Sequence, residues 1–413
     1  MQVSKTTKKQ HVNISIPKEV VVEILQRVPC EDLFETLKKV CMHWCSIIYS
    51  GSFAYSHVEC RILKSSSSFS QLEAVVIVSI DGTRSVTVSA LEWHNSFPNY
   101  PDESWETKYM YTLDIDVLDF PQVITVNSVN GFVCFWSCNA RLHVFNPLTE
   151  EYYTTPPYTY ENRFVPLRLA AVGFGFCQLS YEYKVVVLHG DGEGLESVEI
   201  KPLVFTVGTD RSWRSLKAIP DRKFYTRHEK GVHVKGVLYW YMDSCTLPRC
   251  RSKIITSLIC FNVSKEEVVT TMVPAELDSL EGGGRYVSRI AEKGGNLCLV
   301  NISYGPVCSL LIKVYIADTS TDLSSFNSWK NEFNVTVPNM AYNINIKNLW
   351  FVSIVTDDML VIRIMGERTE IFIDVATGML LSARTSSASF IPYVPSLVSL
   401  FHRPPLLNSS FTC

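Results

Sequence analysis

The sequence predicts a small N-terminal all-α module followed by a large all-β domain, arranged as a β-propeller of about six blades. Three observations lead to this fold class. Apolar residues recur at helical spacing before a serine-rich break at residues 65–68, and short β-branched and aromatic runs separated by turn residues follow it. These runs repeat at a nearly constant interval. With 413 residues, of which 46% are hydrophobic and 19% charged, the chain can bury a large core.

The first helix is predicted over residues 18–28. Pro17 suits its first turn, because a proline lacks the backbone N–H that would be unpaired there. Positions 20, 21, 24, 25 and 28 are apolar, so one face of this helix is apolar. Pro29 ends the helix, and Asp32 is expected to cap the next one. Apolar residues continue at helical spacing through a second and a third segment at Leu33, Leu37, Val40, Cys41, Trp44, Ile47 and Ile48.

This helical module is too small to bury its own apolar residues. A domain of about 45 residues buries only about 60% of the surface that its unfolded chain exposes, so the apolar excess needs a partner surface. The expected divisions of the chain are a polar tail at 1–14, the helical module at 15–60, a linker at 61–70, the β domain at 71–402 and a tail at 403–413.

The β domain contains an internal repeat. Strands that end in a polar turn carry an aromatic anchor at positions 145, 205, 261, 315 and 372, at intervals of 60, 56, 54 and 57 residues. Turn pairs such as Asn130-Gly131 and Lys235-Gly236 open an apolar strand before most anchors. A strand-rich unit of about 50 residues is typical of a kelch-like propeller blade. One further unit before Phe145 reaches Val86-Thr87-Val88, so we count about six blades, with five or seven as alternatives.

The helical module resembles the F-box, the adaptor-binding module of SCF-type ubiquitin ligases. The matching residues are Ile16-Pro17, Glu23-Ile24-Leu25, Arg27-Val28-Pro29, Asp32-Leu33, Val40-Cys41, Trp44 and Phe53. The resemblance implies docking on a Skp-family adaptor, which links the module to a cullin scaffold. The residues that it assigns to the adaptor face or to the support of that face are Ile16, Pro17, Ile24, Leu25, Val28, Pro29, Leu33, Val40 and Trp44. An ordinary helical cap on the following domain is the alternative interpretation.

The β domain resembles the F-box-associated domain of large plant F-box families. The matching segments, in the family's order, are 131–134, 146–152, 173–176, 182–186, 212–214, 231–240 and 395–400. The glycines among them permit tight turns, and Trp213, Tyr239 and Trp240 supply large buried areas. We therefore expect structural roles for these residues rather than ligand contacts.

Charge and cysteine usage limit the partners and the compartment. A net charge of -3 disfavours nucleic acid or a membrane surface as the main partner. No apolar leader region and no run of about 18 apolar residues is present, so a cytoplasmic or nuclear location is expected. The 13 cysteines are then expected to be free thiols in a reducing compartment.

No arrangement of residues predicts catalysis, a metal or a cofactor. Cys41, His43 and Cys45 lack the second pair of ligands that a zinc site needs. The carboxylate pairs Glu150-Glu151, Glu266-Glu267 and Asp357-Asp358 fall in predicted turns, where solvated acids are common. We expect a protein without enzymatic activity of its own.

These features predict a substrate-recognition subunit of an SCF-type E3 ubiquitin ligase that captures an unknown target protein through propeller loops. The candidate loops are 157–166, 189–197, 244–252, 278–285 and 319–328. The aromatic and arginine residues in them that best fit interface composition are Tyr158, Tyr160, Arg163, Arg249 and Arg251. A carbohydrate-active propeller enzyme and an adaptor-binding scaffold that does not deliver targets for degradation are the alternatives.

Overall fold

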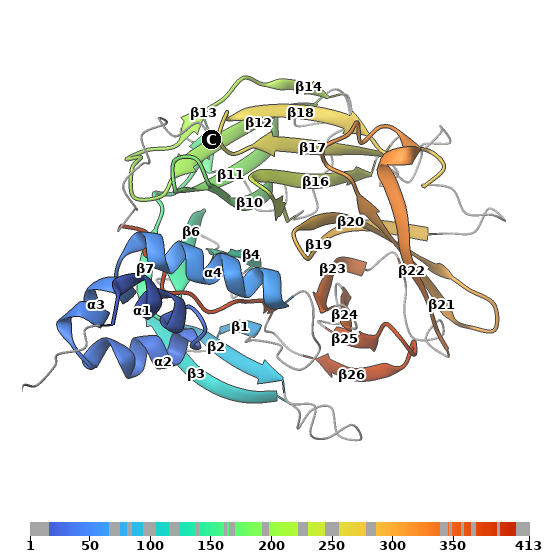
Figure 1. Ribbon diagram of the computed structural model, residues 1–413. Coiled ribbons are helices and arrows are strands. Elements are labelled where there is room, and N and C mark those ends of the chain that lie inside the picture. The colour runs from blue at the N-terminus through green and yellow to red at the C-terminus, as the bar shows by residue number, and fades with distance from the viewer. Residues whose placement is uncertain are drawn as a thin grey trace, which may run out of the picture.

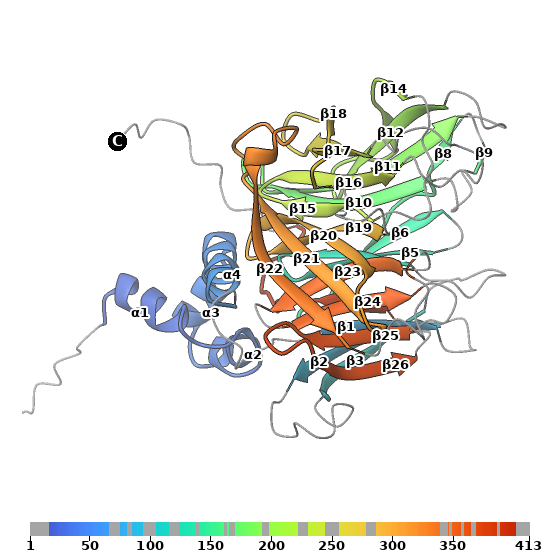
Figure 2. The same cartoon turned by 90° about the vertical axis from the view of Figure 1, so that its right-hand side faces the viewer.

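A helical module lies against one end of a ring of β-sheets (Figure 1, Figure 2). The structure is a computed structural model of the whole chain. It describes residues 16–65, 75–80, 85–93, 105–114, 124–137, 140–160, 163–164, 170–191, 198–221, 230–243, 256–277, 286–338, 346, 349–356, 359–364, 369–385 and 389–401. Both predicted tails lie outside these residues.

The first helices of the module follow the predicted pattern, with two corrections: the first ends at Leu25 rather than at residue 28, and the second has another cap. Their bounds are α1 (Lys18–Leu25), α2 (Cys30–Glu35), the 3-10 turn η1 (Leu37–Lys39) and α3 (Met42–Ile48). Asp32 does not cap α2, so that prediction was wrong. Pro29 occupies the cap, since its carbonyl already accepts the N–H of Leu33 at 3.1 Å, and Asp32 lies within the first turn.

A fourth helix, α4 (Gly51–Ser65), runs through the first half of the predicted linker. The expected boundary at residue 60 was therefore wrong. Ala54 and Val58 are buried in an apolar cluster with the propeller, and Ile62 packs against the same cluster. Their four-residue spacing places them on one side of the helix. Contact with the propeller thus extends the helix beyond the small module.

Six sheets of four or five antiparallel strands make up most of the described part of the β domain. Their orders are β27-β1-β2-β3, β4-β5-β6-β7, β10-β11-β12-β13 with β14 beside β12, β15-β16-β17-β18, β19-β20-β21-β22 and β23-β24-β25-β26. A separate short pair is formed by β8 (Thr159–Tyr160) and β9 (Arg163–Phe164).

The strand bounds in the first three sheets are β1 (Val75–Ile80), β2 (Ser85–Trp93), β3 (Trp105–Asp114), β4 (Ile124–Val129), β5 (Phe132–Ser137), β6 (Arg141–Asn146), β7 (Glu151–Thr154), β10 (Ala170–Cys177), β11 (Glu182–Asp191), β12 (Val198–Thr206), β13 (Arg214–Ser215) and β14 (Ile219–Asp221). Those in the other sheets are β15 (Val232–Val234), β16 (Val237–Asp243), β17 (Thr256–Asn262), β18 (Glu267–Met272), β19 (Tyr286–Lys293), β20 (Asn296–Tyr304), β21 (Leu310–Ala317), β22 (Trp329–Val337), β23 (Leu349–Thr356), β24 (Met359–Ile364), β25 (Thr369–Asp374) and β26 (Leu380–Thr385), with β27 at Ser389–Pro392. The turn η5 (Phe326–Ser328) precedes β22.

The sheets close into a ring, which confirms the predicted propeller. The first strand of each sheet touches the first strand of the next, in the circuit β27, β4, β10, β15, β19, β23 and back to β27. The closing strand β27 comes from the C-terminal end of the chain and pairs antiparallel with β1, with Ile391 opposite Val76. The first sheet is therefore completed only when the last strand has joined it.

The repeat read from the sequence matches the blades. Each of the five aromatic anchors lies on the third strand of its sheet, namely β6, β12, β17, β21 or β25, and the residues at 86–88 lie on the equivalent strand β2. In three blades the polar residue after the anchor caps the following turn. Asn262 accepts the N–H groups of Ser264 and Lys265 at 3.0 and 2.9 Å, and Asp374 accepts that of Thr377 at 2.7 Å.

Large aromatic residues fill the spaces between neighbouring blades. Trp240, on β16, is fully buried and donates its indole N–H to the Val172 carbonyl at 3.4 Å. A Cβ on Gly173 would stand 2.6 Å from a ring carbon of Trp240, so only glycine allows the two blades to approach this closely. Trp240 therefore has the structural role that the sequence predicts.

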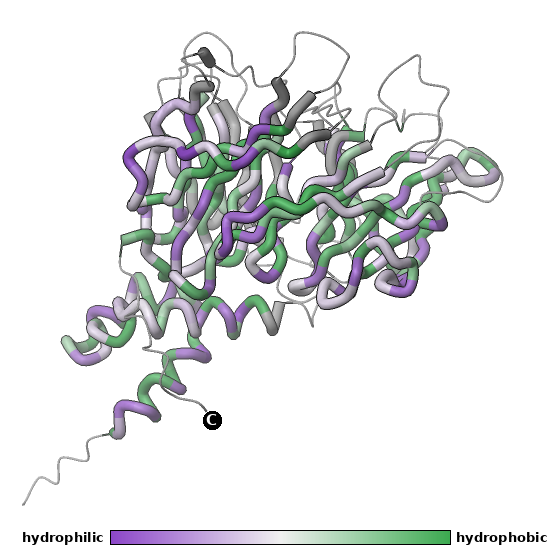
Figure 3. The backbone as a smooth tube through the Cα atoms, turned by 90° about the horizontal axis from the view of Figure 1, so that it is seen from above, coloured by the Kyte–Doolittle hydropathy of each residue, from purple (hydrophilic) through white to green (hydrophobic). Residues whose placement is uncertain are grey.

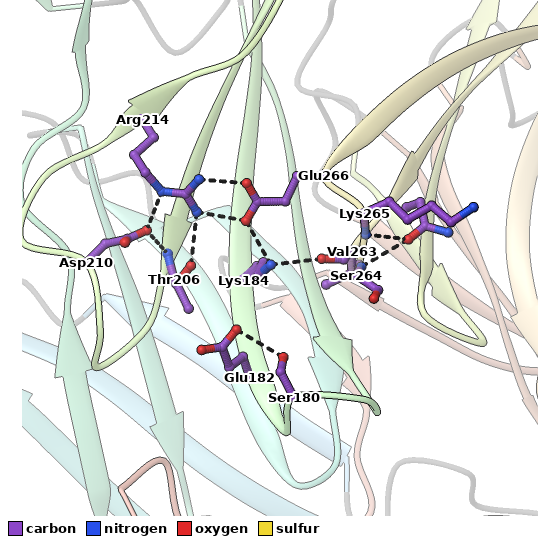
Figure 4. Close-up of polar contacts among 11 residues, drawn as sticks. Ser180, Glu182, Lys184, Thr206, Asp210, Arg214, Val263, Ser264, Lys265 and Glu266 are labelled. Atoms are coloured by element: carbon purple, nitrogen blue, oxygen red, sulfur yellow. Dashed lines mark hydrogen bonds and ion pairs between the residues drawn. The ribbon is translucent and has the colours of Figure 1, made fainter. Parts of the chain in front are cut away.

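An ion network joins the β10–β14 blade to its neighbour (Figure 4). The Glu266 carboxylate, at the β17–β18 turn, accepts from both terminal nitrogens of Arg214 at 2.6 and 2.8 Å and from the Lys184 ammonium at 2.8 Å. Arg214 also contacts Asp210 at 3.0 Å. The bonds from Arg214, with smaller effects from Lys184, lower the pKa of Glu266 from 4.5 to about 2.

The Glu266→Gln variant should be less stable than the wild type at pH 7, because two cations lose their carboxylate partner. The stability that ionised Glu266 contributes is present above pH 4.5 and is lost as the pH falls through about 2. The difference in melting temperature between the two proteins should therefore shrink over that range. Glu267→Gln, a change at the exposed adjacent residue, is the control and should leave the melting temperature unaltered. A Glu266→Gln difference that stays the same from pH 7 to pH 3 would contradict this account.

Candidate functional site

Helix α1 has two apolar faces in different environments. Val21 and Leu25 are buried in an apolar cluster that also contains Leu33, Ile47, Ile48 and Phe53. Val20 and Ile24, one position earlier in each case, are 44% and 47% exposed. Because residues four apart lie on the same side of a helix, Val20 and Ile24 form an apolar stripe. No part of the chain that the structure describes covers this stripe.

Further apolar side chains of the module are exposed. Val40 is 58% exposed between η1 and α3, and Met42, the first residue of α3, is 85% exposed. Ile16 and Tyr49 are also more than half exposed. We call Ile16, Val20, Ile24, Val40, Met42 and Tyr49 the exposed apolar set. Figure 2 shows that α1 lies on the side of the module away from the ring, and in Figure 3 apolar segments continue along the projecting helices.

The structure divides the residues predicted to bind an adaptor into two groups. Ile16, Pro17, Ile24, Pro29 and Val40 are exposed and available to a partner. The others belong to the interior of the module, where Leu25 and Leu33 are fully buried and Val28 and Trp44 pack against the same cluster.

Val20, Met42 and Tyr49 belong to the exposed apolar set but were missing from the prediction. The four-residue spacing between Val20 and Ile24 was the signal that could have found the first of them.

Two sets of polar contacts lie next to the exposed apolar set. Arg27 and Glu23, one turn apart on α1, form an exposed ion pair at 2.6 Å. The Lys38 ammonium lies 3.5 Å from the centre of the Phe34 ring and donates to the Tyr49 hydroxyl at 3.2 Å. These charged groups thus have partners within the module itself.

Helix α4 joins the module to the propeller. Tyr55 stacks on Phe176 with ring centres 5.2 Å apart and meets the edge of Tyr181 at 4.8 Å. Gln178, in the same β10–β11 turn, donates to Glu59 at 3.1 Å. These contacts place the module at the end of the ring where the β10–β11 turn lies.

A buried polar chain forms a second link to the propeller. His57, on α4, makes a hydrogen bond of 2.9 Å through Nε2 to the Val28 carbonyl, so Nε2 carries the proton. Its Nδ1 lies 3.6 Å from the Cys30 thiol, and Cys30 donates to the Pro395 carbonyl at 3.1 Å. No sequence signal linked these residues, since 365 positions separate Cys30 from Pro395.

The prediction that Tyr158 contacts a target is wrong. Tyr158 is fully buried between Trp136 and Trp213, at ring-centre distances of 5.5 and 5.8 Å, and burial raises the pKa of its hydroxyl well above 10. Its position after a proline pair suggested an exposed loop residue. The side chain instead packs between aromatic rings of two adjacent blades. Tyr160 and Arg163 lie on the β8–β9 pair, and Arg249 and Arg251 lie outside the described residues.

In the part of the chain that the structure describes, one member of each acidic pair makes hydrogen bonds or ion pairs that hold the fold together. Glu151 accepts bonds from the Ser399 hydroxyl and the Leu400 N–H at 2.8 and 2.9 Å, and Glu266 belongs to the ion network. Asp357-Asp358 lies outside the described residues. Among the described residues, no three His, Cys, Asp or Glu side chains gather as metal ligands would. No described helix is long and apolar enough to cross a membrane.

Comparison with known proteins identifies the β domain. Residues 84–354 match the family model of the F-box associated beta propeller domain. An Arabidopsis thaliana protein provisionally named an F-box protein is 22% identical over 76% of this chain and 80% of its own length. An F-box/kelch-repeat protein of Arabidopsis thaliana is 24% identical over 63% of this chain and 66% of its own.

A solved chain from a nidogen/laminin complex is 10% identical and aligns over 77% of this chain and 96% of its own length, with a TM-score of 0.40. The family match covers well over half of the chain, and its domain is the ring of blades described above. The chain therefore belongs to the family of F-box proteins that carry an F-box associated β-propeller domain.

Proposed function

We propose that this protein is the substrate-recognition subunit of an SCF-type E3 ubiquitin ligase. The helical module docks on a Skp-family adaptor and through it on a cullin scaffold, while the propeller holds a target protein for ubiquitination. The subunit itself performs no bond chemistry and acts in the cytoplasm or the nucleus. The observation that carries the proposal is the exposed apolar stripe of α1, within a module whose residue order resembles the F-box.

The physical support comes from the second apolar face of α1. Burial of one face against Leu33 and Phe53 accounts for the folding of the module, but it leaves Val20 and Ile24 in water. Exposed apolar residues that are grouped rather than scattered mark interaction sites. A helical partner surface that covers this stripe would gain about 25 cal/mol for each Å² of apolar area removed from water.

Target capture is proposed at the end of the ring opposite the module. The module touches the turn that joins β10 to β11, so by antiparallel alternation β11 runs to the other end and stops there at Asp191. The candidate loop 189–197 therefore begins at the far end. The loop 319–328 joins the third and fourth strands of its sheet and lies at the module's end instead. A target on the far end would leave the adaptor face clear.

A double substitution in the exposed stripe tests the adaptor contact. Val20→Asp with Ile24→Asp should weaken binding of the full chain to a purified Skp-family adaptor by about 30-fold or more, since a buried interface anchor contributes about 2 kcal/mol. Isothermal titration calorimetry measures the loss. Val269→Asp, at a 60% exposed apolar position on β18, is the matched control and should bind like the wild type. Full affinity in the double variant would remove the basis of the proposal.

Alanine substitutions at adjacent positions of α1 separate the folding face from the binding face. Leu25→Ala should destabilise the module by about 2–5 kcal/mol, because it empties a packed site. Ile24→Ala should change stability by no more than about 0.5 kcal/mol, because its side chain is partly solvated. Native-state hydrogen exchange across α1 to α3 measures both. Equal effects at the two positions would show that Ile24 also belongs to the interior.

A further inference from the structure

A C-terminal segment, residues 393–400, lies between the helical module and the propeller. We call it the strap. It begins directly after β27, the strand that closes the ring. Tyr393, Ser396, Val398 and Leu400 are all buried, although the strap contains no helix or strand among its residues. An irregular segment is rarely this buried, because its backbone polar groups need partners.

The propeller supplies those partners on one side of the strap. The Asn146 amide donates to the carbonyls of Ser396 and Val398 at 2.9 and 3.1 Å. Glu151 accepts the N–H of Leu400 at 2.9 Å. At Gly131 the strap passes so close that a Cβ would stand 2.3 Å from the Ser396 Cβ, and its φ of +83° also favours glycine.

The module contacts the strap on the other side. The Cys30 thiol donates to the Pro395 carbonyl, and Leu397 packs against both the interior cluster of the module and the cluster beneath α4. Val398 and Leu400 lie in that second cluster together with Tyr55 and Val58 of α4. The strap is therefore a shared layer, bonded to the ring and packed against the helices.

We infer that Asn146 is a positioning residue for the helical module, and that the module takes its place only on a ring that has closed. Once β27 has paired with β1, the strap lies next to Asn146 and is held there by its amide. Leu397 and Pro395 of the ordered strap then contact the module. This inference concerns the joint between the two parts, and it holds whether or not the module binds an adaptor.

The repeat provides a matched comparison for Asn146. Asn146 and Asn262 follow the aromatic anchors of two blades, and in both the side-chain oxygen accepts two backbone N–H groups of the turn. At 374 an aspartate caps the equivalent turn and accepts the N–H of Thr377. Only Asn146 uses its amide group to hold the strap carbonyls. Asn146→Asp therefore keeps the turn cap but points a carboxylate at two carbonyls. Asn262→Asp keeps both backbone N–H bonds that Asn262 accepts.

The test is hydrogen–deuterium exchange by mass spectrometry on the full-length protein and the two variants. In Asn146→Asp we expect exchange in 393–400 and in α4 to rise by about tenfold or more, with β16 to β21 unchanged. Asn262→Asp should match the wild type throughout. If Asn146 stabilised only its own blade, Asn146→Asp would instead raise exchange across the neighbouring strands of that blade.

Two results would overturn the inference. One is a strap that exchanges freely in Asn146→Asp while α4 keeps its protection, since α4 alone would then hold the module. The other is unchanged exchange in both segments. If Asn146→Asp does not fold, Leu397→Ala is the second variant, because it removes the side chain that touches both clusters but leaves every strap hydrogen bond to the ring. It should raise exchange in α4 while β4 to β7 stay protected, and normal protection of α4 would refute the proposal.

Discussion

The pairing of β27 with β1 is the constraint on which the rest of the structure depends. Strands from the two ends of the β domain complete one sheet. The circuit of first strands is continuous only through β27, which belongs to that sheet. A sheet without its inner strand would leave both an open edge and an unpacked neighbour. The strap and the packing of α4 follow from this closure, because the residues that form them emerge from β27 or rest on the closed blades.

The few apolar residues of the helical module lie on three different surfaces. Leu25 and Phe53 build its interior, Tyr55 and Val58 face the ring, and Val20 and Ile24 face water. A unit of this size cannot bury all of them by itself, because small domains retain a large share of exposed surface. The propeller covers one of these surfaces, whereas the stripe on α1 stays exposed in the part of the chain that the structure describes.

The periodic parts of the chain could be predicted and the special contacts could not. The anchors near 57-residue spacing located the third strand of five blades, since each blade repeats the same local pattern. Reasoning of the same local kind expected Tyr158 to be open to a target, although it is fully buried, and ended the helical module before α4 was complete. Both errors arose where a side chain meets a distant blade, and local pattern contains no information about which distant residues will surround it.

The sequence by itself determined the fold class, the approximate number of blades and the resemblance of the first helices to an F-box, because these depend on spacing and turn chemistry within short segments. Only the tertiary structure decided which face of α1 is buried, and it alone revealed the strap between Asn146 and Cys30. The physical reason is that burial and hydrogen-bond partners are set by closure of the ring, which brings residues together across more than 240 positions of the chain.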